Sequence, residues 1–146
     1  MQQRFLTIWP YFIFAAGLLA ALQFWPASYW LEVSTVQINS GHDSLDLDML
    51  VDRKIKRSFN GATAIAIREW QGAWVVVCSG QSGGGGDFLA GARMPKRLTL
   101  GMWTAGQCLP LRPGQYTVSK TWTIQSLGLM PDKTVTQTSN AFNVWP

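Results

Sequence analysis

A short acidic stretch holds the residues of this chain that are best suited to bind a metal. Four carboxylates, Asp43, Asp46, Asp48 and Asp52, follow His42 within ten positions, and carboxylate oxygens are the ligands that Ca²⁺ prefers. The spacing does not fit a calcium loop of the EF-hand type, which needs a Gly at its sixth position and a Glu at its twelfth. Asp46 and Asp48 alternate with leucines, so we expect them on the solvated face of a strand and predict no metal site.

A basic run follows the acidic stretch and consists of Arg53, Lys54, Lys56 and Arg57. Such a cluster could bind lipid headgroups or a polyanionic partner, so the four residues are candidate binding residues. Four charges make a small footprint for nucleic acid, which we do not expect as a partner. The alternative is a solvated loop whose charges are offset by the neighbouring aspartates, and the sequence favours that alternative.

Five tryptophans beyond residue 30 could form a platform for a sugar or a protein if they were exposed in a row: Trp70, Trp74, Trp103, Trp122 and Trp145. In a two-sheet structure, one or two tryptophans usually fill the core. Trp122 lies on the apolar face of a predicted strand and should be one of them. Trp103 and Trp145 are the better candidates for exposure, and we take them as candidate binding residues.

The chain has two cysteines, Cys78 and Cys108. In an oxidising compartment such a pair predicts one disulfide, which would close a loop of about 30 residues and contribute roughly 3–4 kcal/mol. Two buried free thiols are the alternative. The spacing excludes CxxC redox chemistry.

The sequence offers few residues for catalysis, and we predict that the protein is not an enzyme and carries no cofactor. His42 is its only histidine, and it has no nucleophile elbow, HExxH motif or paired glutamates. SGGGGD (82–87) lacks the Gly-Lys-Ser/Thr ending of a phosphate loop and predicts a loop inside the disulfide-closed segment. A hydrolase would need an acid, for which Glu69 is the only plausible residue.

The N-terminal segment predicts a membrane anchor. No charged residue lies between Arg4 and Glu32, and Phe5–Leu22 is almost continuously apolar. As a helix this run would rise about 27 Å, close to the roughly 30 Å hydrocarbon core of a bilayer. A cleaved signal peptide is the alternative. The apolar region of a signal peptide usually has about 7–15 residues and is followed by a small-x-small cleavage site, whereas this run is longer and no such site follows it. We predict an uncleaved transmembrane helix over residues 5–27.

The placement of basic residues predicts the orientation of this anchor. Arg4 and the N-terminal amine lie on one side, and Arg53 is the first basic residue on the other. By the positive-inside rule, we expect residues 1–4 in the cytoplasm and residues 30–146 as a domain on the outer side of the membrane, held there by a single span.

The predicted exported part has the alternation of β-strands. In QYTVSKTWTIQ (115–125), one face carries Tyr116, Val118, Trp122 and Ile124, with Lys120 as the exception. Gln71-Gly72 predicts a tight hairpin. Six further strands are expected at 31–38, 44–51, 62–70, 73–79, 97–103 and 133–144, the last of which could break near Ser139-Asn140. Seven strands predict an all-β sandwich of two sheets.

The end of the chain resembles an immunoglobulin-like or fibronectin-type domain. LRPGQYTV and SNAFNV look like its last two strands, with Tyr116 placed as the residue of a tyrosine corner. Val118 stands where an immunoglobulin has its second cysteine, so Cys78 and Cys108 are not the usual intersheet pair. The resemblance implies a seven-stranded immunoglobulin-like β-sandwich and carries topology only.

The whole layout also resembles small membrane-anchored proteins encoded by tailed bacteriophages and prophages of Gram-negative bacteria. The stretches that carry this resemblance are QFWPASYWLEV, DRKIKRSFNG, GQCLPLRPGQY and SNAFNV. It implies a location in the inner membrane of the host, with the domain of residues 30–146 in the periplasm, and no known activity. We therefore expect a non-enzymatic interaction module that contacts an envelope protein, as an adaptor, in superinfection exclusion or in lysis. The alternatives are an anchored cell-wall or carbohydrate-binding protein or hydrolase, and a structural subunit of an envelope or virion assembly.

Overall fold

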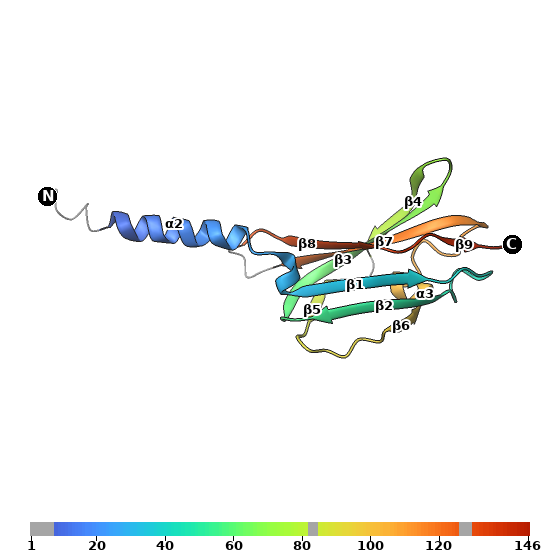
Figure 1. Cartoon of the computed structure of the whole chain (residues 1–146), viewed down its shortest axis with the longest axis horizontal. Coiled ribbons are helices and arrows are strands. Elements are labelled where there is room, and N and C mark those ends of the chain that lie inside the picture. Colours follow the sequence, from blue (N-terminus) through green and yellow to red (C-terminus); the bar gives the residue numbers. More distant parts are fainter. Residues whose placement is uncertain (1–7, 82–84, 126–129) are drawn as a thin grey trace.

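The computed structural model describes residues 8–81, 85–125 and 130–146, in which one long helix extends from a body of β-strands (Figure 1). The helix is α2 (Trp9–Gln23), and the 3-10 helix η1 (Ala27–Tyr29) joins it to the strands. A second, short helix is α3 (Leu100–Thr104). The described residues form nine strands: β1 (Leu31–Ile38), β2 (Asp48–Ile55), β3 (Phe59–Trp70), β4 (Trp74–Gln81), β5 (Gly86–Phe88), β6 (Arg97–Thr99), β7 (Gly114–Gln125), β8 (Lys133–Thr138) and β9 (Phe142–Val144).

The strands form two sheets in which every pair of neighbours is antiparallel. The three-stranded sheet has the order β1-β2-β6, and the larger sheet has the order β4-β3-β7-β8, with β5 added beside β3 and β9 beside β7. The prediction of a mainly β structure is confirmed. The structure has two more strands than the predicted seven, because β5 was not expected and 133–144 forms both β8 and β9.

A single hydrophobic core lies between the two sheets. The smaller sheet contributes Val36, Met49 and Val51, and the larger sheet contributes Ile67, Val118, Trp122 and Ile124. The alternating face predicted for 115–125 is the buried face of β7, and Trp122 is in the core as expected. Because successive side chains of a strand point to opposite faces of its sheet, the apolar residues of both sheets lie on the two faces that contact each other.

The strand predicted over 44–51 is wrong in its first half, because β2 begins only at Asp48. Residues before it turn: the Asp43 carboxylate accepts a hydrogen bond from the Leu45 N–H at 2.9 Å, as in an Asx turn. The buried Ser44 hydroxyl accepts the Leu111 N–H at 2.9 Å. A local side-chain bond therefore replaces the strand ladder. Asp46 and Asp48 are exposed, as expected.

The strand predicted over 97–103 is also wrong in part, because β6 ends at Thr99 and α3 follows. The Thr99 hydroxyl caps this helix by accepting the Met102 N–H at 3.3 Å. Gly101 lies so close to Leu45 that a Cβ would be 2.9 Å from the Leu45 carbonyl oxygen. The turn into a helix brings Trp103 inward rather than to the surface.

Two predicted breaks are confirmed. The hairpin between β3 and β4 turns at Gln71–Ala73, with Gly72 at a φ of +81°, a conformation that favours glycine. Between β8 and β9, the Asn140 side chain accepts the Ile38 N–H at 2.7 Å and donates to the Ile38 carbonyl at 3.0 Å. This break therefore bonds the two sheets to each other.

Helix α2 carries no charged residue and none of its residues is buried. Within residues 8–81, 85–125 and 130–146, no helix is both long enough and apolar enough to cross a bilayer. The anchor predicted over residues 5–27 extends beyond α2, and residues 5–7 lie outside the described residues, as do residues 82–84 of the glycine-rich segment.

Candidate interaction surface

The hairpin of β3 and β4 projects from the rest of the β structure (Figure 1). Strand β4 pairs with β3 from Gln81 to Trp74 and is an edge of the larger sheet in the part of the chain that the structure describes. An edge strand presents backbone N–H and C=O groups that can pair with another chain. The hairpin therefore offers a row of main-chain donors and acceptors.

The outer half of this hairpin is apolar and exposed. Trp70 and Trp74 face each other across the strands, with ring centroids 5.2 Å apart in an edge-to-face arrangement. Their exposed fractions are 48% and 40%, and Val75, Val76 and Val77 are exposed by 43–50%. We call the residues Trp70, Trp74, Val75, Val76 and Val77 the hairpin patch.

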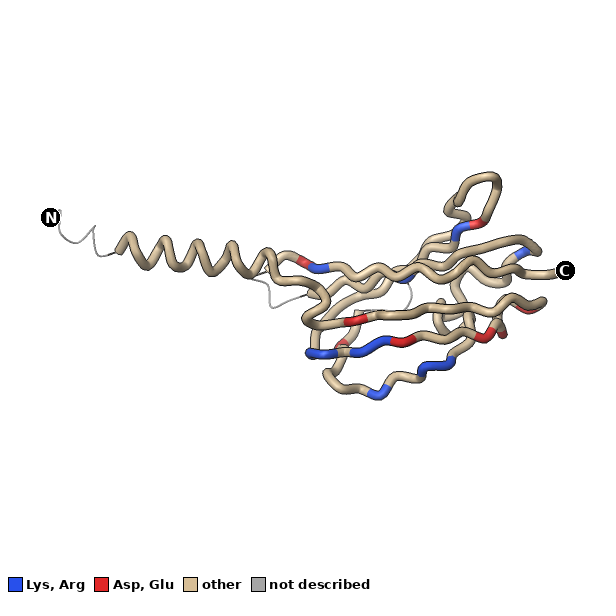
Figure 2. The backbone as a smooth tube through the Cα atoms, viewed as in Figure 1, with Lys and Arg blue, Asp and Glu red and all other residues tan. Residues whose placement is uncertain are grey.

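The hairpin patch lacks the charges that usually protect an edge strand. Strand β4 reads WVVVCSGQ and has no charged residue, and Figure 2 shows charge only at the base of the projecting loop. Soluble proteins usually protect such edges with lysines, prolines or a covering segment. An exposed, uncharged and β-branched edge is the geometry that accepts an added strand from a partner.

A disulfide fixes the inner end of β4. Cys78 and Cys108 are bonded with their Cα atoms 5.8 Å apart, which confirms the predicted pair. Gly80 lies against the Gln107 side chain, so the segment after α3 packs beside the inner part of β4. The outer part, Trp74–Val77, extends beyond the disulfide and the contact with Gln107. The bond thus holds the base of the hairpin while its patch stays accessible.

Trp103 was expected at the surface, and this prediction is wrong, because its exposed fraction is 2%. The Arg53 guanidinium lies 4.9 Å and the Lys120 ammonium 4.3 Å from the centroid of the Trp103 ring. Trp103 is therefore a core residue that contacts two cations. It is not available as a stacking surface.

Lys120 is the exception on the apolar face of β7, and it is buried with an exposed fraction of 9%. Its ammonium donates to the Trp103 carbonyl at 2.9 Å. Burial and the nearby Arg53 guanidinium lower the pKa of Lys120 to about 8. Burial also lowers the pKa of Arg53, whose Nε has no acceptor among the described residues.

The basic run does not form one patch. Arg53 is half-buried against Trp103, whereas Lys54, Lys56 and Arg57 are exposed at the end of the domain that faces α2. Lys56 pairs with Glu32 at 2.7 Å, and this contact lowers the pKa of Glu32. The Arg57 guanidinium lies 4.7 Å from the centroid of the Tyr29 ring. The sequence favoured a solvated loop for this basic run, and in the structure the run forms the end of β2 and the residues that follow it.

Trp145 is exposed by 48%, as expected, and its ring lies 5.3 Å from that of His42. The His42 Nδ1 is 2.7 Å from the Pro146 carbonyl oxygen. Glu69 contacts the Tyr116 hydroxyl at 3.2 Å and accepts a bond from the Gln71 amide at 2.6 Å. Among the described residues, no three His, Cys, Asp or Glu side chains lie together as metal ligands would.

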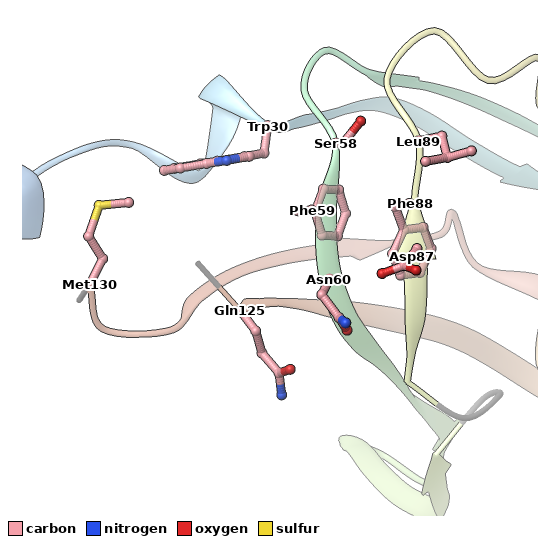
Figure 3. Close-up of a pocket in the computed structure, with 9 residues that line it drawn as sticks. All are labelled: Trp30, Ser58, Phe59, Asn60, Asp87, Phe88, Leu89, Gln125 and Met130. Carbon is pink, nitrogen blue, oxygen red and sulfur yellow. The ribbon is translucent and has the colours of Figure 1, made fainter. Parts of the chain in front are cut away.

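A cavity of about 500 Å³ opens at the end of the domain nearest α2 (Figure 3). Its apolar lining includes Trp30, Phe59, Phe88 and Met130, and the rings of Phe59 and Phe88 are stacked with centroids 4.7 Å apart. Asn60, Asp87 and Gln125 add polar groups to the lining. The volume lies within the range of pockets that bind small molecules.

No protein-family model, curated protein sequence or solved structure matches this chain. The assignment of a role therefore rests on the residues described above.

The sequence reasoning missed the hairpin patch. Trp70 and Trp74 are each two or fewer residues from the predicted Gln71-Gly72 turn, and residues that flank a hairpin turn are cross-strand neighbours. The connection in the structure has three residues, Gln71–Ala73, and pairs Trp70 with Trp74, whereas the predicted two-residue turn would have paired Trp70 with Ala73. The available signal was the presence of two tryptophans within two residues of the turn.

Proposed function

We propose that the chain is a non-enzymatic interaction module, anchored in the inner membrane, whose β4 edge binds an extended segment of an envelope protein in the periplasm. The exposed, uncharged β4 edge with its tryptophan pair is the observation that carries the proposal. A chain of this kind encoded by a phage could act on the host envelope as an adaptor, in superinfection exclusion or in lysis.

The apolar N-terminal run supports the anchor. Phe5–Leu22 carries no charge, and α2, which overlaps this run, exposes apolar side chains on all sides and extends away from the β strands (Figure 1). A helix that is apolar all round needs a protein core or a bilayer around it. The described part of the chain supplies no such core for α2, which favours the bilayer.

The order of the strands supports an immunoglobulin-like sandwich. The two sheets pack face to face with orders β1-β2-β6 and β4-β3-β7-β8. The Tyr116 hydroxyl donates to the Arg112 carbonyl, four residues upstream, at 3.0 Å, which is the bond of a tyrosine corner. Domains of this architecture often present sheet edges and end loops to partners.

The partner we propose is an uncharged, apolar extended segment that pairs with β4. Main-chain bonds would supply affinity, and Trp70 and Trp74 would act as aromatic anchors, since such side chains dominate many interfaces. A second copy of this chain fits less well. Antiparallel pairing of two β4 strands would turn one domain end for end relative to the other. Strand β3, and β4 with it, runs between the helix-facing end and the hairpin tip (Figure 1), so this pairing would also reverse the direction of one α2. The two anchors would then point in opposite directions rather than into one membrane.

The test compares partner recovery for two matched variants of the full-length chain. Val76→Lys places a charge in the hairpin patch, and Leu50→Lys makes the same kind of change at an exposed position of β2. After crosslinking in membranes, we expect Val76→Lys to lower recovery of the dominant envelope protein about tenfold, as a loss of 1.4 kcal/mol would. Leu50→Lys should leave it unchanged. Equal recovery with both variants would contradict the β4 site, and retention on isolated peptidoglycan instead would favour a wall-binding role.

A further inference from the structure

The cavity at the helix-facing end has an apolar interior and lies where the chain leaves α2. Trp30 follows η1 directly and lines the cavity together with Phe59 and Met130 (Figure 3). Leu89, at the opposite side of the opening, is exposed by 63%. The cavity thus forms an apolar recess at the end of the domain from which the apolar helix extends.

One arginine beside this cavity has no acidic partner. Arg57 precedes Ser58, which lines the cavity, and the Arg57 N–H donates to the Trp30 carbonyl at 3.3 Å. Its guanidinium is held over the Tyr29 ring at 4.7 Å, and no carboxylate in the described residues pairs with it. Lys56, its neighbour, is engaged by Glu32 at 2.7 Å.

The two sides of the cavity opening differ in the sign of their charges. Arg57 and Lys54 are exposed at the same end of β2, where Lys54 is the register partner of Glu32. Among the described residues that line the cavity, the one acid is Asp87, on β5. An oxyanion is therefore favoured on the side of Arg57, whose planar guanidinium suits a phosphate.

We propose that this cavity binds one phospholipid of the bilayer that holds α2, with an acyl chain among Trp30, Phe59 and Met130 and its phosphate on Arg57. The inference rests on the membrane anchoring in the proposed function, because α2 would place the cavity at the level of the headgroups. The apolar recess and an arginine that no described carboxylate pairs with match the two chemical parts of such a lipid. Trp25 and Tyr29, which precede Trp30 in the chain and contact each other, are of the type enriched at this depth.

The test measures phospholipid retention by the full-length chain in mild detergent, using native mass spectrometry with added phosphatidylglycerol. We expect the wild type to retain about one lipid per chain, because the structure has one such cavity beside Arg57 in its described part. Arg57→Gln removes the phosphate contact and Leu89→Asp makes the opening acidic. Each should lower the retained fraction about tenfold. Both side chains are exposed, so neither change replaces a buried side chain.

Arg93→Gln, a change at another exposed arginine, is the matched control and should retain lipid like the wild type. Equal retention by the wild type and both cavity variants, or none by the wild type, would overturn the site. Equal binding of a diacylglycerol, which has no phosphate, would overturn the role of Arg57. Recovery of the chain in the soluble fraction would instead contradict the anchoring, so the two failures are distinguishable.

Discussion

Trp103 and Lys120 show why single residues were the hardest part to predict. Trp103 was expected at the surface, at the end of a strand predicted over 97–103, whereas α3 brings it into the core. Lys120 was the one discordant residue on an apolar strand face, and its ammonium is satisfied by the Trp103 carbonyl and ring. Both positions depend on a tertiary contact between α3 and β7, which no local pattern encodes.

Lys120 makes the stability of the folded domain depend on pH. Its pKa is about 8 in the folded protein against an ordinary value of 10.5, so the unfolded chain binds more protons between these two values. Stability therefore rises with pH through this window, by up to about 3 kcal/mol in total. We expect denaturant unfolding at pH 9.5 to require a higher midpoint than at pH 7.5.

Lys120→Met should flatten this rise, and Lys54→Met, at an exposed lysine of β2, should keep it. The comparison stops at pH 9.5 because burial and the nearby Glu69 raise the pKa of Tyr116, which opposes the trend above about pH 10. A midpoint that falls between pH 7.5 and 9.5 in the wild type would contradict the assignment.

The disulfide is the second residue-level prediction. Cys78 and Cys108 are 30 residues apart, so replacing both with Ser should lower the free energy of unfolding by roughly 3–4 kcal/mol. Chemical denaturation of the wild type with and without reductant gives the matched comparison. If reduction leaves the wild-type midpoint unchanged, the bond does not contribute as predicted.

At the scale of elements, alternation predicted the long strands well. β1 has the predicted bounds, and β7 begins within one residue of the predicted start. The failures lie where a side chain bonds to nearby backbone: Asp43 turns the chain before β2, and Thr99 caps α3. Such local bonds compete with the ladder and leave the hydrophobic pattern intact. The hairpin patch was missed because its exposure depends on how far β3 extends beyond the core.

Gly61 provides a test of the pairing between β3 and β7. A Cβ at this position would collide with the Thr123 carbonyl oxygen, whereas a Cβ at Gly86, its register partner on β5, would meet no atom within 4 Å. We expect Gly61→Ala to destabilise the domain by about 1–3 kcal/mol, as overpacking does. Gly86→Ala should have little effect. Thermal unfolding of both variants measures this, and equal melting temperatures would contradict the close approach.

At the scale of the molecule, the sequence predicted two parts, an apolar N-terminal segment and a β domain, and the structure has this division. The sequence did not predict that Lys54, Lys56 and Arg57 would lie at the helix-facing end. Their position there follows from the register of β1 with β2. The hairpin tip and the helix-facing end are thus separate surfaces. We propose that the first binds a protein partner and that the second faces the membrane.

The anchor makes a prediction for the whole chain. Leu18→Arg places a charge inside the apolar run, which costs about 2.5–3.5 kcal/mol at the centre of a membrane helix. We expect this variant to leave the alkali-resistant membrane fraction, in which the wild type should remain at its full mass of 16.2 kDa. Leu45→Arg, at an exposed position of the β domain, is the control. A wild type shortened by about the first 27 residues would indicate cleavage instead.

The most direct test of the central claim is photo-crosslinking from the hairpin patch in intact cells. A photoreactive residue at Trp74, Val76 or Val77 would sample successive points along β4, and one at Leu50 would be the control. Strand addition predicts that the β4 positions crosslink to one short segment of one envelope protein, with sites that shift in order along it. Crosslinks at Leu50 alone, to many proteins equally, or to a second copy of this chain would contradict the proposed role of β4.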